Sequence, residues 1–377
     1  MRLLIDARFT RTDQHDGISR FGASLIKAVA TRTQTAMLIS DERQLALLPD
    51  VPHVKVTSPL SPAELFVAAR VNGLEPDVVF CPMQTMGSWG RRYPLILTLH
   101  DLIYYEHPEP PGFLPAPVRL LWRLYHKAYW PQRMLLNRAD VVATVSHTTK
   151  WLMAEKRLTN RPVRIVGNAP QNGREPRDPD AAPRRSLVYM GSFMPYKNVE
   201  TVIAGMASLP EYTLHLLSRV APARRAELEA LVPAGASVAF HGGVSEEEYE
   251  SLLREATALV SLSRSEGYGL PLVEAMSLGT PVIASDIPIF REVGGEGAKF
   301  VDPDSADAFA AAVRELERPS VWPEASRAAV RQAETFSWDR SADALLDAAE
   351  EAIELFRRRQ DGAAAPGTLR GGRRRRA

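Results

Sequence analysis

The sequence predicts an α/β fold made of two doubly wound domains, each built on a parallel sheet. Short β-rich runs alternate with helical patterns from end to end, as expected for parallel sheets covered by helices on both faces. The chain has 377 residues and is 45% hydrophobic, which suffices for two domains that each bury a core. One segment near the middle, residues 167–185, lacks apolar periodicity. We therefore expect a ligand between the domains, at the carboxyl ends of the strands.

The first domain is expected to span residues 1–170. Its expected strands are β-rich runs bounded by turn residues, namely Leu3–Asp6, Ala36–Ile39, Val54–Thr57, Val78–Cys81, Leu95–Leu99, Val141–Val145 and Val163–Val166. The turn Asp16-Gly17-Ile18 predicts the start of a helix that runs to Ala30. Ser61, Pro62 and Glu64 offer an N-cap, a first helical residue and a capping-box partner.

The segment 167–185 holds four prolines, two glycines and two asparagines, which is typical of a linker or hinge. We assign the linker itself to residues 171–185 and the second domain to residues 186–336. The expected strands of that domain are Leu187–Met190, Thr213–Leu217, Val238–Phe240, Ala258–Leu262, Val282–Ala284 and Lys299–Val301. A long helical pattern follows at 337–359, and residues 360–377 form a basic tail that we expect to be disordered.

Composition excludes several classes of function. The formal net charge is +1, so no overall field favours nucleic acid. The single cysteine, Cys81, excludes an intrachain disulfide and fits a reducing compartment. The start of the chain lacks a signal-peptide pattern, and no run of about 18 apolar residues predicts a membrane span. P-loop, serine-elbow and paired Cys-x-x-Cys motifs are missing from the sequence. We expect a cytoplasmic protein.

The stretch Ser263–Ser285 says most about function. It sets Glu266 before a glycine turn formed with Gly267 and Gly269, and Glu274 inside the helix that follows. A glycine turn that opens a helix binds anions, because free amide groups and the helix dipole point at one spot. Two carboxylates beside an anion site suit a ligand that also carries hydroxyls, such as a nucleotide-diphosphate sugar. Alternatively, Glu274 only complements the helix dipole.

Several segments resemble a known family. The sequence from Glu266 to Met276, Glu-Gly-Tyr-Gly-Leu-Pro-Leu-Val-Glu-Ala-Met, is similar to the signature of the large retaining glycosyltransferase family 4, of GT-B fold. Other segments that fit the family are Asp16–Phe21, Leu97–Leu102, Leu187–Asn198, His241–Tyr249 and Phe336–Trp338. The resemblance implies two Rossmann-like domains facing a central cleft, with the acceptor-side domain first and the donor-binding domain second. It also implies that the last helix, 337–359, crosses back to the first domain.

The resemblance implies roles for particular residues. Glu274 accepts hydrogen bonds from the nucleotide ribose, and Glu266 from the transferred sugar. The amides of Tyr268, Gly269 and Leu270 serve the sugar and the phosphates, together with Gly267. We therefore predict catalytic roles for Glu266, His100 and Lys197, and donor binding by Gly17, Ser192, Lys197, Arg264, Gly267, Tyr268, Gly269, Leu270 and Glu274.

Some of these residues have plainer interpretations. Lys197, the only lysine between Lys156 and Lys299, is implied to contact the donor diphosphate, or is a solvated loop residue. His100 follows an apolar strand and is implied to lie near the scissile bond; alternatively, backbone groups satisfy it. Asp101 beside it is equally a turn cap. Gly17 is implied to close over the phosphates, or belongs to an ordinary N-terminal cap.

One position departs from the family pattern. Most relatives have an arginine directly after the glycine that ends the first strand of the second domain, whereas Ser192 follows Gly191 here. A serine donates one hydrogen bond but brings no charge. Arg264 and Arg219 are the candidates to reach the phosphates instead.

We expect no metal and no other cofactor. The pairs Asp178/Asp180 and Asp302/Asp304 have a spacing that elsewhere holds a divalent cation. The first pair lies in the linker, and the second precedes a helix, where aspartates act as caps. With a lysine and a helix N-terminus present, a cation is not required.

The acceptor side is less defined. In Pro117–Arg138 one helical face collects Val118, Leu121, Trp122, Tyr125 and Tyr129, and another collects Arg119, Arg123, His126, Lys127 and Trp130, before Pro131 is expected to interrupt the helix. Core packing of the apolar face is favoured over binding to an anionic membrane. The basic tail suggests weak peripheral attraction to the inner face of a membrane.

The sequence therefore predicts a metal-independent, retaining glycosyltransferase that moves a sugar from a nucleotide-diphosphate donor to a glycan or lipid-linked acceptor. The first candidate for the sugar is mannose, from GDP-mannose. UDP-sugars remain open as donors. Two alternatives stay open: a nucleotide-sugar epimerase of the same fold, and a non-catalytic partner that binds a nucleotide sugar. No partnership with nucleic acid is expected.

Overall fold

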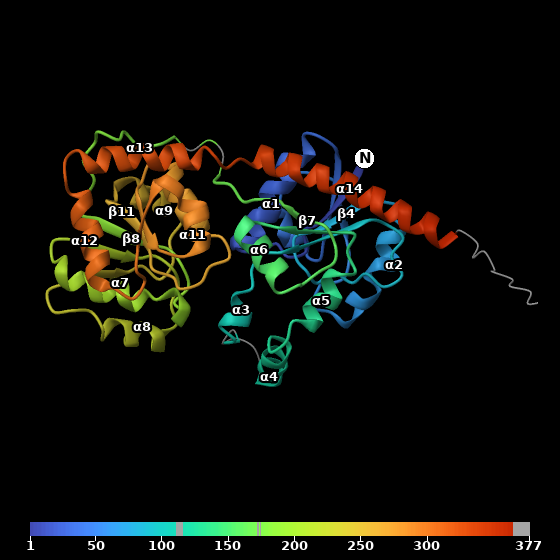
Figure 1. Ribbon diagram of the computed structural model, residues 1–377, viewed down its shortest axis with the longest axis horizontal. Helices are drawn as coiled ribbons and strands as arrows, with labels where there is room; N and C mark the ends of the chain where they lie inside the picture. The colour runs from blue at the N-terminus through green and yellow to red at the C-terminus, as the bar shows by residue number, and fades with distance from the viewer. Residues whose placement is uncertain (111–115, 172, 174, 365–377) are drawn as a thin grey trace, which may run out of the picture.

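The computed structural model describes residues 1–110, 116–171, 173 and 175–364. Within these ranges the chain forms two α/β domains that lie side by side (Figure 1). Each domain contains one parallel sheet with helices on its faces, as the alternation of patterns predicts. The expected fold class is confirmed.

The first sheet has seven strands among the described residues, in the order β3-β2-β1-β4-β5-β6-β7. The strands are β1 (Arg2–Asp6), β2 (Gln34–Ile39), β3 (His53–Lys55), β4 (Val78–Cys81), β5 (Leu95–Leu99), β6 (Val141–Thr144) and β7 (Val163–Ile165). All neighbours pair in parallel. Strand order reverses between β1 and β4, so a crevice is expected outside their carboxyl ends.

The second sheet has six strands in the described part of the chain, in the order β10-β9-β8-β11-β12-β13. The strands are β8 (Ser186–Tyr189), β9 (Thr213–Leu216), β10 (Ser237–Phe240), β11 (Ala258–Ser261), β12 (Val282–Ser285) and β13 (Ala298–Val301). They too are all parallel, and order reverses between β8 and β11. Every strand expected from the sequence is present in the two sheets, with ends shifted by a residue or two.

Helices cover both sheets (Figure 1). In the first domain they are α1 (Gly17–Ala30), α2 (Val67–Asn72), α3 (Ile103–Glu106), α4 (Ala116–Tyr125), α5 (Trp130–Leu136) and α6 (His147–Glu155). After the linker they are α7 (Val199–Gly205), α8 (Pro222–Glu229), α9 (Glu246–Glu255), α10 (Leu270–Ser277), α11 (Pro288–Gly294), α12 (Ala306–Leu316), α13 (Val321–Ala333) and α14 (Trp338–Ala364). Single 3₁₀ turns lie at Glu42–Leu47, Pro62–Phe66, Pro195–Lys197, Met206–Ser208 and Gly295–Gly297.

Helix α1 illustrates how local sequence sets an element. Asp16 caps it by accepting a hydrogen bond from the amide of Ser19 at 2.9 Å, which satisfies one of the free N–H groups of the first turn. Phe21, Leu25 and Ile26 recur at helical spacing and are buried against the first sheet. The predicted helix, up to Ala30, is confirmed.

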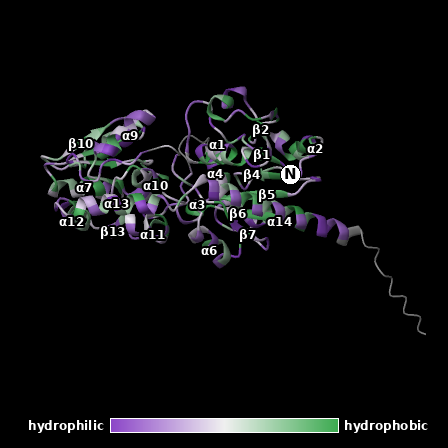
Figure 2. Ribbon diagram, turned by 90° about the horizontal axis from the view of Figure 1, so that it is seen from above, coloured by the Kyte–Doolittle hydropathy of each residue, from purple (hydrophilic) through white to green (hydrophobic). Residues whose placement is uncertain are grey.

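Helix α14 packs on the first domain although it follows the second in sequence. It contacts α1 and strands β4 to β7, and the ring of Trp338 lies 6.1 Å from that of Phe21. The indole of Trp338 also donates to the carbonyl of Pro170 at 2.9 Å. The helix continues past the expected end at 359 to Ala364, so the first residues of the predicted tail are helical. The outer end of α14 is coloured hydrophilic in Figure 2. Residues 365–377 lie outside the described part.

The described linker residues run along the second domain. The amide of Arg177 donates to Leu278 O at 3.0 Å, and its guanidinium lies over the ring of Trp322. The amide of Arg184 donates to Glu255 O. The linker is therefore tied to one domain along much of its length.

Two local expectations were wrong. Glu64 does not complete a capping box; its carboxylate pairs with the buried Arg8 and accepts the amide of Gly87. Pro131 does not end a helix but sits in the first turn of α5, where its missing N–H costs nothing.

The core packing expected for the apolar face of the 117–138 segment holds only in part: Trp122 and Tyr129 are half-buried against the rings of Tyr104 and Tyr105, whereas Val118 and Leu121 are exposed. Helix α4 has no buried residue, and Leu120, Leu121 and Leu124 are 54–68% exposed. Among the described residues, no helix combines the length and apolarity needed to cross a bilayer.

Candidate active site

A cavity of about 600 Å³ lies between the two domains. The first domain contributes residues 13–17 and Arg20 from the start of α1. The second domain contributes the loops after β8, β9 and β10 and the start of α10, including Leu270 and Glu274. The cavity thus lies outside the carboxyl ends of the strands at the switch points of both sheets, as expected for doubly wound domains.

The glycine turn before α10 has two different structural reasons for its glycines. Gly269, at the N-cap of α10, has φ +100°, a conformation that a residue with a Cβ rarely adopts. Gly267 is not in that region. Its need is space: a Cβ at Gly267 would lie 2.9 Å from Oδ2 of Asp101 in the other domain. The turn therefore marks a close approach between the two domains.

Lys197 and Glu266 form a pair at the mouth of this turn. Lys197 ends a 3₁₀ turn after β8, and its Nζ lies 2.5 Å from Oε1 of Glu266. Ser263 donates a second hydrogen bond to the same oxygen at 2.9 Å. Both charged side chains are mostly buried. The solvated-loop interpretation of Lys197 is therefore wrong, because the ammonium is mostly buried and paired with Glu266, although neither residue lines the interdomain cavity.

Glu274 is buried and shared between domains. Its Oε2 accepts the hydroxyl of Tyr249 at 3.0 Å, and its Oε1 lies 3.5 Å from a guanidinium nitrogen of Arg20. Arg20 also pairs with Glu246 at the start of α9. Burial opposes the charge of Arg20, but its hydrogen bond to Glu246 and the charges of both glutamates leave its pKa raised. A carboxylate held in this way does more than complement a helix dipole.

His100 and Asp101 line a smaller cavity of about 110 Å³ in the first domain. Nε2 of His100 donates to the carbonyl of Pro82 at 2.7 Å, so Nδ1 is the nitrogen left to accept. Burial lowers the pKa of His100. Oδ1 of Asp101 accepts the amide of Ile103, as in a turn cap, while burial and, less strongly, Glu266 raise its pKa. The cap interpretation of Asp101 holds for one oxygen only, since the other faces Gly267.

The residues proposed to replace the missing arginine differ in position. Ser192 is exposed, and its carbonyl accepts the hydroxyl of Tyr189 at 2.8 Å. Arg264 is exposed and paired with Asp304, outside the lining of the cavity. Arg219 lines the cavity and lies against Gly243, where a Cβ would come within 3.0 Å of its Cγ. Of the two arginines that the sequence suggested, Arg219 is the one at the cavity.

Tyr268 anchors the turn from behind. Its side chain is buried, and its hydroxyl donates to the carbonyl of Asn168 at 2.8 Å, just before the linker. The side chain therefore points away from the cavity. Gly17 and Leu270 meet at the wall of the cavity, since a Cβ at Gly17 would lie 3.8 Å from Leu270 Cδ1, within van der Waals contact.

The aspartate pairs considered for a metal are engaged in turns. Asp178 accepts the amide of Asp180, and Asp302 accepts the amide of Asp304, each at 2.9 Å. Asp180 and Asp304 also pair with Arg327 and Arg264. Across the described ranges, no group of three or more histidine, cysteine or acidic side chains is arranged to hold a metal ion.

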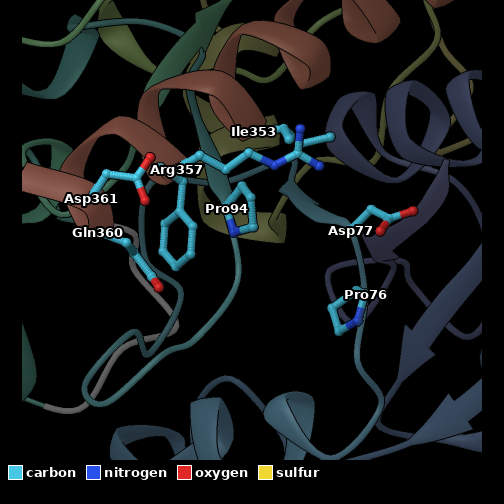
Figure 3. A pocket seen from close by; sticks show the side chains of 8 residues that line it. Pro76, Asp77, Pro94, Ile353, Arg357, Gln360 and Asp361 are labelled. Atoms are coloured by element: carbon cyan, nitrogen blue, oxygen red, sulfur yellow. The ribbon is translucent and has the colours of Figure 1, made fainter. Parts of the chain in front are cut away.

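Another cavity, of about 370 Å³, lies at the opposite edge of the first sheet (Figure 3). Pro76, Asp77 and Pro94 stand just before β4 and β5, and Arg357 and Asp361 come from the outer end of α14. Since it is at the amino ends of the strands, this cavity is separate from the interdomain site.

Sequence reasoning missed Arg20 and Tyr249. Both stand in segments that resemble the family, but nothing in their spacing reveals that they meet Glu274. That meeting depends on how α1, α9 and α10 converge. Two doubly wound domains, a cavity between them with Glu274 in its wall, and the adjoining glycine turn with Glu266 are the features of a glycosyltransferase of GT-B fold, and comparisons with known proteins agree.

Residues 17–169 match the family described as Glycosyltransferase Family 4, and residues 175–335 match the family described as Glycosyl transferases group 1. The O-antigen chain mannosyltransferase RfbU of Salmonella typhimurium is 25% identical over 71% of this chain and 74% of its own length. The O-antigen chain mannosyltransferase B of Escherichia coli is 28% identical over 67% of this chain and 69% of its own. The structure of Anabaena HepE with UDP and glucose has a TM-score of 0.69 at 17% identity, covering 92% of this chain and 98% of that one.

The two family matches together take in most of both domains. The chain belongs to glycosyltransferase family 4, and it is an enzyme of the glycosyltransferase class.

Proposed function

We propose that this glycosyltransferase takes a sugar from a nucleotide-diphosphate donor and transfers it to a glycan or lipid-linked acceptor. The first candidate for the sugar is mannose, from GDP-mannose. The observation that carries the proposal is the interdomain cavity of about 600 Å³, with Glu274 in its wall and the start of α10 at its edge. Its volume is in the range of sites for ligands of nucleotide size. Glu274 offers acceptors for the ribose hydroxyls, and the free amides at Gly269 and Leu270 offer donors to the diphosphate.

Lys197 and Glu266 are assigned to the two parts of the donor that separate in the reaction, Lys197 to the diphosphate and Glu266 to the sugar. Glycosyl transfer leaves a nucleoside diphosphate with one more negative charge than it had as the donor. An ammonium held in a largely buried setting stabilises that charge more than a solvated one does. As Lys197 turns toward the phosphate, the carboxylate of Glu266 becomes available to the sugar hydroxyls. His100, neutral and offering Nδ1, is proposed to accept a hydrogen bond from the transferred sugar.

Mannose is proposed as the sugar because two relatives matched over two thirds of their length are mannosyltransferases by name. The HepE structure contains UDP and glucose, so a UDP-sugar is the alternative donor. A thermal-shift screen with GDP, UDP and ADP separates these cases, since a ligand at 100 times its Kd adds about 2.7 kcal/mol of stability. A shift with UDP and none with GDP would replace mannose by a UDP-linked sugar.

We propose that transfer needs no metal ion. Lys197 and the amides of the α10 turn supply positive charge where a cation would otherwise act, which supports this assignment. Transfer should therefore persist in excess EDTA. Loss of transfer with EDTA and recovery with magnesium would contradict metal independence without affecting the donor site.

We propose retention of configuration at the anomeric carbon, as the family resemblance implies. Glu266 is paired with Lys197 and Ser263, so the departing phosphate, on the same face as the acceptor, is assigned the acceptor proton. NMR of the product from an α-linked donor should show an α-linkage. A β-linked product would overturn this step.

Helix α4 supports an acceptor held at a membrane. Val118, Leu120, Leu121 and Leu124 are 44–68% exposed, and Arg123 and Lys127 on the same stretch are exposed as well. Apolar side chains that insert at the headgroup boundary, beside cations that attract anionic lipid, give peripheral binding. We propose that this helix docks on an anionic bilayer, where a lipid-linked acceptor would lie.

Vesicles of phosphatidylcholine with and without phosphatidylglycerol test the membrane assignment. The wild-type chain should co-sediment with the anionic vesicles at low salt, and Leu121→Ser should weaken this without lowering the midpoint of thermal unfolding, because Leu121 is exposed. Leu231→Ser, at an exposed leucine of the second domain, is the control. Equal binding by both variants would contradict docking through α4.

The two alternative activities have their own signatures. An epimerase would convert its nucleotide sugar with no acceptor present. A non-catalytic partner would bind the nucleotide sugar, in calorimetry, with neither hydrolysis nor transfer across many acceptors. Donor consumption that depends on an added acceptor supports the proposed transferase over both.

A further inference from the structure

Arg20 links the two domains at the donor cavity. It lies on α1, close after Gly17, and its side chain lines the cavity. Its guanidinium contacts two carboxylates of the second domain, Glu246 on α9 and Glu274 on α10. The side chain is 17% exposed, so it is enclosed by the cavity walls yet reached by solvent from inside.

A diphosphate entering this cavity needs positive charge that the usual position does not supply. Ser192 is neutral, Arg264 is engaged with Asp304 outside the cavity, and Lys197 is paired with Glu266, which leaves Arg219 and Arg20 as the arginines that line the cavity. Meanwhile the cavity wall carries Glu246 and Glu274. A diphosphate between these carboxylates would be repelled unless a cation compensates for them.

Arg20 lies at the right distance to supply that charge. Its Nη1 is 3.5 Å from Oε1 of Glu274, the group proposed to bind the ribose. The ribose hydroxyls and the first phosphate are attached to one five-membered ring, so a guanidinium beside the hydroxyls reaches that phosphate by a side-chain rotation. The helix beneath it is held firmly, because Phe21 and Leu25 are buried in the core.

We infer that Arg20 is a donor-binding residue supplied by the acceptor-side domain, and that it exchanges its contact with Glu246 for an oxygen of the donor diphosphate. The inference rests on the proposed function of the cavity. Glu246 holds the guanidinium in the absence of donor, so it competes with the phosphate. Since Arg20 comes from the first domain, and Glu274 and the α10 turn from the second, donor binding holds the domains together.

Two consequences follow for affinity. Replacing Arg20 should lower the affinity for a ligand more, the more phosphates the ligand carries. The affinity for the bare nucleoside should hardly change. Replacing Glu246 should strengthen phosphate-bearing ligands, because Arg20 no longer has to leave a carboxylate. A contact that merely joined the domains would change all ligands alike, and would be weakened by both replacements.

The test measures binding of GDP, GMP and guanosine, and of UDP, UMP and uridine, to the full chain by calorimetry, with competition for the weak nucleosides. Arg20→Ala should weaken the preferred nucleoside diphosphate about tenfold, as expected for the loss of one charge-assisted hydrogen bond, and its nucleoside by less than about twofold. Arg20→Lys should recover part of the loss. Glu246→Gln should tighten the diphosphate about twofold to fivefold.

Arg32→Ala is the matched control. Arg32 also makes two interelement ion pairs, with Asp339 and Asp343 on α14, but it does not line the cavity. Its variant should bind every ligand as the wild type does. The midpoint of thermal unfolding of each variant reports whether it is folded.

The outcomes separate the inference from the function on which it rests. Three results would each overturn the assignment of Arg20 to the phosphate. Arg20→Ala could lower the affinities for nucleoside and diphosphate equally, it could lower neither, or Glu246→Gln could lower the affinity for the diphosphate. If neither GDP nor UDP binds the wild type, the proposed function of the cavity fails instead.

Discussion

Nζ of Lys197 and Oε1 of Glu266 lie 2.5 Å apart, so the residues assigned to the diphosphate and to the transferred sugar neutralise each other. The pair comes from the loops after β8 and β11, which are neighbours in the second sheet. Because the two charges pair with each other, neither is left unpaired in this mostly buried position, where an unpaired charge would be strongly destabilising. Donor binding must then divide the pair between phosphate and sugar.

Lys197→Ala should lower kcat about 100-fold while changing the donor KM much less. The ammonium is assigned to stabilise the negative charge that develops on the diphosphate as it leaves. Loss of one such group lowers kcat by about 100-fold in comparable sites. Steady-state kinetics with saturating acceptor measure both constants. Arg264→Ala, which removes a nearby exposed cation paired with Asp304, should leave kcat within about twofold. A kcat for Lys197→Ala close to that of the wild type would remove Lys197 from the chemistry.

Glu274→Ala should raise the donor KM about tenfold or more, whereas Glu266→Ala should mainly cut kcat. The first loses the acceptor of the ribose hydroxyls, which also accepts the hydroxyl of Tyr249; the second loses contact with the transferred sugar. Tyr249→Phe, which keeps Glu274 in place, should raise the donor KM only slightly. Unchanged kinetics in both glutamate variants would remove this division of roles.

Gly267→Ala should impair transfer although the backbone there is not strained for alanine. The added Cβ would lie 2.9 Å from Oδ2 of Asp101, so the domains would be forced apart or Asp101 displaced. We expect kcat/KM to fall at least tenfold, with the unfolding midpoint little changed. Asp101→Ala alone, and combined with Gly267→Ala, completes a double-mutant cycle. If the double variant is no more active than the sum of the single effects predicts, the contact between these residues is not the cause.

Acidification should destabilise the protein in part through His100. Burial lowers its pKa in the folded chain below the ordinary 6.5, so the unfolded chain takes up the proton more readily. The stability due to neutral His100 is therefore complete above pH 6.5 and is lost as the pH falls below that value. Urea unfolding at pH 7 and pH 5 should show that the free energy of unfolding falls less on acidification in His100→Asn than in the wild type. His147→Asn, at an exposed histidine, should keep the wild-type loss.

The strands and their order along the chain followed from sequence because buried parallel strands are short, continuous apolar runs with turn residues at both ends. Val78–Cys81 and Leu95–Leu99 are fully buried and were predicted at these bounds. The glycine turn before α10 was equally readable, since Gly269 and Pro271 have strong conformational preferences of their own.

Helix α4 shows where periodicity misleads. An apolar stripe on a helix predicts burial only if another element covers it, and Leu121 is exposed although its spacing fits a core position. The pattern is the same for a helix that packs on a sheet and for one that meets a lipid surface. Only the arrangement of the neighbouring elements distinguishes the two.

The sequence by itself determined the two sheets, the linker region, and the residue types gathered around one glycine turn, because these depend on local preferences and on the burial of apolar runs. Only the tertiary structure decided which residues meet: Lys197 with Glu266, Asp101 with Gly267, and Arg20 with Glu246 and Glu274. Those meetings join segments far apart in sequence, and two of the three join different domains. Electrostatic interaction depends on distance in space, which spacing along a chain does not specify.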